Sequence, residues 1–98
     1  MEQIKADLAV DLEIPSPKMS KVVMLNDDYT AMEFVVMILC EVFKKNQSEA
    51  QNIMLKIHNE GSGICGIYPY DIAHTKAKIA RIKSKEAGFP LRIVVEDE

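Results

Sequence analysis

Apolar and polar positions follow a pattern along the chain that predicts six elements in the order strand, helix, helix, strand, helix, strand. The apolar runs at 21–25, 64–68 and 91–95 are short and bounded by turn-forming residues, which is typical of strands. Between them, apolar residues recur at helical spacing over about 30–45, 48–59 and 70–85. The order βααβαβ predicts an α+β domain, in which three helices pack on a three-stranded antiparallel sheet.

The starts of the first two helices carry the same capping pattern. Thr30 stands three residues before Glu33, and Ser48 stands three residues before Gln51. In such a capping box the two side chains satisfy free backbone N–H groups reciprocally. The sequence therefore predicts helices that begin at Thr30 and Ser48, the second ending before Gly61.

Residues 1–17 are predicted to form a flexible extension that precedes one folded domain, residues 18–98. The extension ends in Ile14-Pro15-Ser16-Pro17, whose prolines disfavour helix and mark a boundary. Its alternating apolar positions also fit an edge strand, and this alternative stays open. At the other end of the chain, the acidic residues after Val95 are expected to fray.

The first predicted helix has an apolar arc that spans about two-thirds of its circumference, wider than the roughly 100° that one-sided burial requires. Such a helix either lies at the centre of the core or exposes part of the arc as a binding surface. The central position is favoured, because a domain of 98 residues with three helices must bury one of them deeply.

Composition and charge narrow the class of protein. The chain is 48% hydrophobic and 28% charged, as is typical of one globular domain. Residues 1–17 hold four acidic side chains and one lysine, which account for the whole net charge of −3. The remaining residues are therefore neutral overall and lack the basic bias of a nucleic-acid binder. No apolar run approaches the roughly 18 residues of a membrane span and no secretory signal is apparent, so we expect a cytoplasmic protein without membrane contact.

Catalytic and metal-binding motifs are missing from the sequence. It contains no GxSxG, HExxH, Walker or GxGxxG pattern, and His58 and His74 do not stand at a recognisable spacing from a nucleophile. Cys40 and Cys65 form no CxxC pair. Residues 63–66 match the GxxG of a KH domain formally, but the two middle residues are apolar. A binding module without metal or cofactor is therefore favoured over an enzyme.

Asn26, Asp27 and Asp28 form a loop rich in hydrogen-bond acceptors after the first strand, and His58 follows Met54 by one helical turn. If this loop meets the second helix, the acceptors suit a cation such as an ammonium group. A calcium site is disfavoured because the spaced D-x-D-x-D-G series is missing. A lone histidine on an apolar helix is more often structural, and that interpretation stays open.

Three segments, NDDYTAMEFV (26–35), IMLKIHNEGSGICGIYPYDIAHTKA (53–77) and FPLRIVVE (89–96), resemble the bacterial ClpS adaptor family of the Clp protease. The resemblance extends from residue 21 to residue 96. It implies a non-enzymatic, monomeric adaptor with the α+β order predicted above. Such adaptors bind N-degrons, which are substrates with N-terminal Phe, Leu, Trp or Tyr, and deliver them to the AAA+ unfoldase ClpA or ClpC for degradation by ClpP.

The resemblance also implies roles for single residues. Asn26 and His58 would hold the α-amino group of the substrate, and Asp27 would assist through water or through its charge. The substrate backbone and hydrophobic pocket would involve Asp28, Thr30, Met32, Val35, Met54, Ile57 and Leu91. The unfoldase interface would involve Asp71 and Lys76.

The sequence departs from the family pattern at two positions. Ala31 stands where proline is frequent, and His74 stands where an acidic residue is common, so the unfoldase-facing surface is the less certain transfer. Three other functions stay open: a KH-like RNA binder, a ribosome-associated module, and an interaction domain that recruits other cargo.

Overall fold

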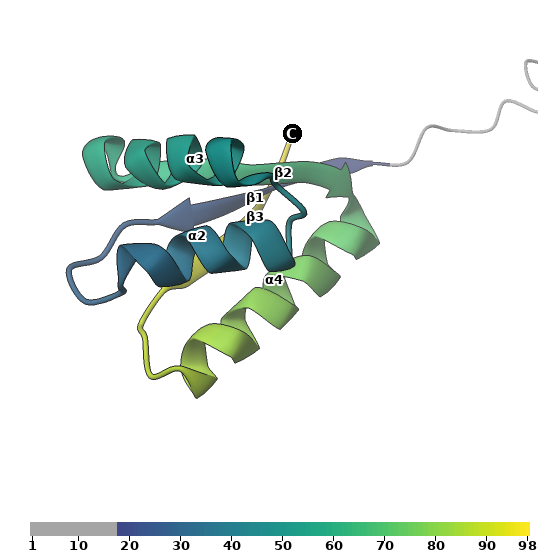
Figure 1. Ribbon diagram of the computed structural model, residues 1–98. Helices are drawn as coiled ribbons and strands as arrows, with labels where there is room; N and C mark the ends of the chain where they lie inside the picture. Colours follow the sequence, from purple (N-terminus) through teal and green to yellow (C-terminus); the bar gives the residue numbers. More distant parts are fainter. Residues whose placement is uncertain (1–17) are drawn as a thin grey trace, which may run out of the picture.

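The computed structural model describes residues 18–98, and the predicted extension 1–17 lies outside the described residues. The elements, in chain order, are β1 (Met19–Leu25), α2 (Met32–Glu41), α3 (Gln47–Glu60), β2 (Ser62–Pro69), α4 (Tyr70–Glu86) and β3 (Arg92–Asp97). The predicted α+β class and the βααβαβ order are confirmed (Figure 1). No helix in this part of the chain is long and apolar enough to cross a membrane.

The sheet is antiparallel with the strand order β2-β1-β3, so β1 lies at its centre. The helices cover one face of this sheet (Figure 1). The register pairs Ser20 with Asp97 and Lys21 with Glu96. The prediction that the acidic end frays is therefore wrong for Glu96 and Asp97, because strand pairing with β1 holds them.

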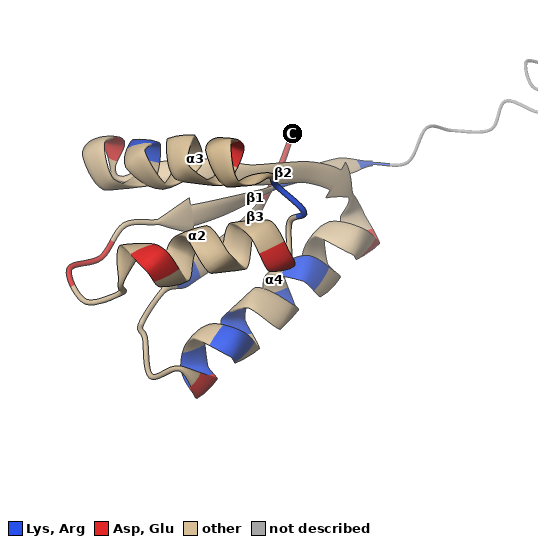
Figure 2. Cartoon of the chain, viewed as in Figure 1, with Lys and Arg blue, Asp and Glu red and all other residues tan. Residues whose placement is uncertain are grey.

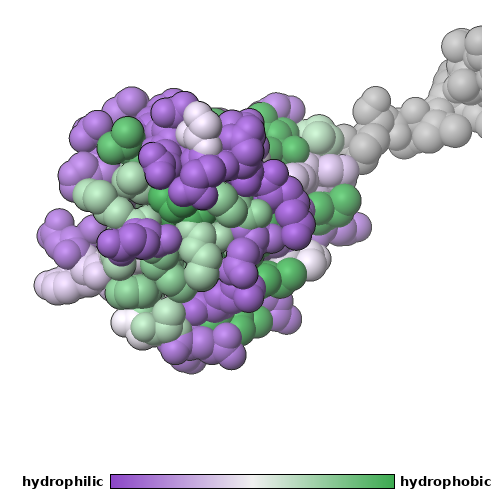
Figure 3. Space-filling view, viewed as in Figure 1, coloured by the Kyte–Doolittle hydropathy of each residue, from purple (hydrophilic) through white to green (hydrophobic). Residues whose placement is uncertain are grey.

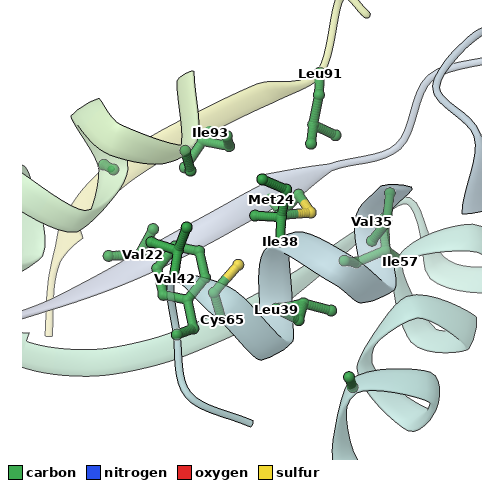
Figure 4. Packing of buried hydrophobic residues seen from close by; sticks show 14 of the residues in the cluster. Val22, Met24, Val35, Ile38, Leu39, Val42, Ile57, Cys65, Leu91 and Ile93 are labelled. Atoms are coloured by element: carbon green, nitrogen blue, oxygen red, sulfur yellow. The ribbon is translucent and has the colours of Figure 1, made fainter. Parts of the chain in front are cut away.

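The core lies between β1 and the helices. Met24 of β1 and Ile38 and Leu39 of α2 are completely buried, and Figure 4 shows their side chains packed together. The same helix leaves Met32 44% and Met37 39% exposed. The predicted central position of α2 is thus confirmed, and part of its apolar arc is exposed.

The helix starts differ from those predicted. Ala31 is the N-cap of α2 and makes no side-chain hydrogen bond, so the predicted capping box of Thr30 and Glu33 is wrong. The Thr30 hydroxyl instead donates to Asp27. A capping box does begin α3, but it joins Asn46 to Glu49 and lies two residues before the predicted pair.

A close approach between α3 and β2 fixes the position of the last turn of α3. A Cβ atom on Gly63 would lie 2.8 Å from Ile57 Cγ1, so only glycine fits there without displacement. Gly61 ends α3 in the left-handed conformation, and its carbonyl accepts from the Asn26 N–H at 2.9 Å. This bond ties the loop after β1 to the end of α3. Residues 63–66 belong to strand β2, so the formal GxxG match is not a KH loop.

Candidate functional site

A half-open cavity of about 190 Å³ lies where the end of β1, the start of α2 and the end of α3 meet. The structure gathers around it the ten residues that were predicted to contact the amino group, backbone and side chain of a substrate: Asn26, Asp27, Asp28, Thr30, Met32, Val35, Met54, Ile57, His58 and Leu91. Their binding roles stay predictions. Leu25 also lines the cavity and was missed by the sequence reasoning, although its place directly before Asn26 was a usable signal.

Asp27 organises the loop on the polar side of the cavity. One carboxylate oxygen, Oδ1, accepts from the Tyr29 N–H at 2.8 Å and the Thr30 N–H at 2.7 Å, and Oδ2 accepts from the Thr30 hydroxyl at 2.8 Å. Partial burial by itself raises the pKa of Asp27, but the hydrogen bonds from Thr30 and Tyr29 outweigh it, so the pKa lies below its ordinary value. Asp27 is therefore an ionised residue that holds the loop in shape.

The side chains of Asn26 and His58 offer acceptors beside this loop. Both residues are exposed, and within residues 18–98 neither side chain makes a hydrogen bond. The His58 side chain is thus not the buried structural histidine of the alternative interpretation. An amide oxygen, an imidazole ring and two nearby carboxylates suit a ligand that donates hydrogen bonds and carries positive charge.

The apolar side of the cavity continues directly into the core. Val35 from α2, Ile57 from α3 and Leu91 from the segment before β3 are all buried members of the core cluster. Figure 4 shows these side chains at the same end of the core. Because core packing holds them, this wall exists before any ligand binds. Met32 and Met54 complete it with longer, more flexible side chains.

The size of the cavity limits its occupant. A cavity of about 150 Å³ holds a ligand the size of benzene. The cavity here, about 190 Å³, therefore fits one large apolar side chain with its polar end at the rim. Among the described residues, no group of three His, Cys, Asp or Glu residues is placed to hold a metal ion.

The two predicted unfoldase contacts, Asp71 and Lys76, lie on α4 away from the cavity. Asp71 is exposed in the first turn of the helix. Lys76 is half-buried: its Nζ donates to the Val42 carbonyl at 2.9 Å and lies 5.3 Å from the centre of the Tyr68 ring. The structure thus separates these two residues from the other predicted site residues, and the amino group of Lys76 is already bound within the chain.

Neither cysteine extends this site. Burial raises the pKa of the Cys65 thiol to about 12, against a smaller opposing effect of Lys45. A thiol of this kind stays protonated and unreactive at neutral pH. Cys40 lies on α2 and donates weakly to Gln47 Oε1 at 3.9 Å.

The fold and the cavity together define a small α+β domain with one cavity that has hydrogen-bond acceptors on one side and a buried apolar wall on the other. Comparison with known proteins identifies its family. The family "ATP-dependent Clp protease adaptor protein ClpS" matches residues 15–94. The chain therefore belongs to the ClpS family of Clp protease adaptors.

Individual relatives agree with this assignment. The ATP-dependent Clp protease adapter protein ClpS of Wolinella succinogenes is 47% identical over 93 residues, which cover 95% of this chain and 91% of the relative. That of Helicobacter hepaticus is 50% identical over 91 residues, covering 93% and 92%. A solved structure of Agrobacterium tumefaciens ClpS2 bound to L-phenylalaninamide is 44% identical with a TM-score of 0.81, and covers 85% of this chain and 100% of that one.

Proposed function

We propose that this adaptor binds N-degrons through the cavity beside α2 and α3 and delivers them to the Clp AAA+ unfoldase, ClpA or ClpC, for degradation by ClpP. The proposal is supported by the two sides of the cavity. It has hydrogen-bond acceptors at its rim and a buried apolar wall, and its volume fits one large side chain. An N-terminal residue is the part of a protein that presents an ammonium group and a side chain on the same atom.

The ammonium group is held by the rim. Asn26 Oδ1 and a His58 ring nitrogen accept its hydrogen bonds, and the charges of Asp27 and Asp28 favour the cation. Asp27 acts through its charge and through the loop it organises, since both of its oxygens already accept from Tyr29 and Thr30. Acetylation of the substrate removes the charge and two of the three N–H donors, so an acetylated N-terminus is excluded.

The side chain of the N-terminal residue fills the apolar part. Burial of a Leu or Phe side chain contributes about 1.5–3 kcal/mol, whereas a micromolar complex requires about 8 kcal/mol. The side chain alone therefore cannot account for recognition, and both ends of the residue must contribute. This requirement explains selection of Phe, Leu, Trp and Tyr at the N-terminus rather than anywhere in a chain.

The similar Agrobacterium tumefaciens ClpS2 supports the proposal that the cavity binds an N-terminal residue. Its ligand, L-phenylalaninamide, carries a free α-amino group and an aromatic side chain on the same carbon atom. The amide of that ligand corresponds to the first peptide bond of a substrate. The present chain offers complementary groups on both sides of its own cavity.

Delivery requires a second surface. We assign it to the exposed Asp71 at the start of α4, together with the extension 1–17, and we place the action of this monomeric adaptor in the cytoplasm. Lys76 supports this surface indirectly: its bond to the Val42 carbonyl fixes α4 against the segment after α2. The cavity and this surface lie on different elements, so a bound substrate leaves the surface free.

A reconstituted degradation assay tests the proposal. A reporter that begins with Leu is incubated with ClpP and either ClpA or ClpC, with the full chain, Asp71→Ala, or a chain that lacks residues 1–17. We expect the full chain alone to support rapid degradation, and all three forms to bind a Leu-initiated peptide equally. Equal degradation with all three forms would refute the delivery surface, and degradation of a Met-initiated reporter at the same rate would refute the specificity.

A further inference from the structure

The outer surface of α2 carries a second hollow that adjoins the cavity. It lies between α2 and α3, has a volume of about 480 Å³, and its apolar residues are Met32, Val36, Met37, Cys40 and Met54. Figure 3 shows apolar surface over α2 between the more hydrophilic surfaces of the neighbouring helices. An open apolar surface of this kind is typical of a binding site, and methionines adapt to side chains of different shapes.

We propose that this groove binds the substrate segment that follows the N-terminal residue, and that it prefers apolar side chains alternating with basic ones. The inference rests on the proposed function of the cavity. Met32 and Met54 line both hollows, so a chain whose first residue fills the cavity passes directly from the cavity mouth into the groove.

The length of the groove sets the number of residues that it can hold. The lining extends along α2 from Met32 to Glu41, which are the first and last residues of the helix, 10 residues in all. A helix of this length measures about 14 Å. An extended chain advances about 3.3 Å per residue. The groove therefore accommodates about four residues, approximately the third to the sixth of the substrate.

The charge at the rim sets the preference for basic residues. Glu33 and Glu41 line the groove at the two ends of α2, and the groove lining includes no lysine or arginine. Figure 2 shows the acidic residues at both ends of this helix. Within residues 18–98 neither glutamate forms an ion pair. Basic side chains that flank an apolar residue in the groove would meet both carboxylates, whereas acidic ones would be repelled.

Titration of peptides of two lengths tests the proposal. Leu-Gly-amide fills only the cavity, and Leu-Gly-Val-Lys-Val-Lys-amide also reaches the groove. We expect the longer peptide to bind about tenfold more tightly, as the burial of about one apolar side chain implies. Relative to Leu-Gly-amide, the affinity of Leu-Gly-Ser-Ser-Ser-Ser-amide should be less than threefold higher. The affinity of Leu-Gly-Val-Glu-Val-Glu-amide should be no higher.

Variants on the surface of the protein separate the groove from the cavity. Met37 lines the groove but not the cavity, so Met37→Glu should abolish most of the tenfold gain and leave the affinity for Leu-Gly-amide unchanged. The matched control is Ile79→Glu on α4, because Ile79 is 41% exposed and Met37 is 39% exposed. This control should change neither affinity. Glu41→Lys should lower the affinity for the Val/Lys peptide and raise the affinity for the Val/Glu peptide.

The outcomes distinguish this inference from the proposed function. The groove proposal is wrong and the cavity proposal stands in two cases, provided that Leu-Gly-amide binds. In the first, the Val/Lys peptide binds no more tightly than Leu-Gly-amide; in the second, it binds more tightly by the same factor in Met37→Glu as in the wild type. If Leu-Gly-amide fails to bind, both are wrong. Sedimentation of the wild type and Met37→Glu gives a further check: a dimer that this change dissociates would mean that a second copy occupies the groove, and would overturn the proposal.

Discussion

Asp27 offers the sharpest test of how the loop after β1 builds the polar side of the cavity. Its carboxylate accepts three hydrogen bonds, two from Thr30 and one from Tyr29. Asp27→Ala removes all three. A hydrogen bond to a charged group contributes about 1.5–3 kcal/mol. Because this carboxylate is only partly buried and water can replace it, we expect a loss of about 2 kcal/mol in unfolding free energy for the three together.

The same change should weaken binding more specifically. Without Asp27 the loop is no longer held in shape in the free protein, so the bound peptide must order it. This ordering costs about 1–2 kcal/mol of binding free energy for each residue fixed. Two such residues correspond to a roughly thirtyfold to thousandfold loss of affinity for a Leu-initiated peptide. Asp27→Asn is the matched control, since its amide oxygen can still accept from the two N–H groups. We expect it to retain most of the stability, while losing the affinity that depends on the negative charge.

Urea unfolding over a range of pH provides the assay for stability. The folded-state pKa of Asp27 is lowered, so the stabilisation is present above the ordinary value of about 3.9 and is lost as the pH falls through the lower folded value. The difference in unfolding free energy between wild type and Asp27→Asn should be constant above about pH 5 and should shrink below about pH 4. Fluorescence anisotropy measures the binding. An Asp27→Ala protein that binds as tightly as the wild type would refute this role of the loop.

Three further changes have definite expected results. Met32→Ala should admit Ile-initiated peptides, because Met32 lines the cavity and the shorter side chain leaves more room for a substrate side chain branched at Cβ. Anisotropy titrations that still exclude Ile would place the selectivity elsewhere. His58→Ala should weaken the binding of a Leu-initiated peptide, because it removes a hydrogen-bond acceptor that lines the cavity, and an unchanged affinity in anisotropy titrations would contradict the contact. Ser20→Ala should raise the unfolding free energy by about 1 kcal/mol, because the buried Ser20 hydroxyl has no hydrogen-bond partner within residues 18–98. Urea titrations measure this change, and a destabilised variant would indicate that the hydroxyl has a partner.

The sequence predicted the order of the elements because the strands are short apolar runs bounded by turn-forming residues, whereas the helices carry apolar residues at helical spacing. It failed at the helix starts. Thr30 fits a capping box by spacing, but its backbone N–H and its hydroxyl both donate to the carboxylate of Asp27. Asp27 and Glu33 each lie three residues from Thr30, so spacing alone cannot decide which carboxylate the Thr30 N–H binds. The order of Glu96 and Asp97 was likewise missed, since their pairing depends on β1, which is distant in the sequence.

The candidate site was predicted from resemblance more than from chemistry. Asn26 and His58 lie 32 positions apart in the sequence, and nothing in either segment specifies that they meet. The bond from the Asn26 N–H to the Gly61 carbonyl and the close approach at Gly63 bring them together. The internal bond of Lys76 to Val42 was also beyond prediction, because it joins α4 to the segment after α2.

In the proposed function, one cavity recognises the free α-amino group and the side chain of an N-terminal residue together. Calorimetric titration of the wild type with a Leu-initiated peptide, its N-acetylated twin and an Ala-initiated peptide tests it most directly. We expect the Leu-initiated peptide to bind with a micromolar or lower dissociation constant, and the other two peptides to bind at least a hundredfold more weakly. Binding of the acetylated peptide with the affinity of the free one would contradict the claim, because the acceptors at the rim would then have no part in recognition.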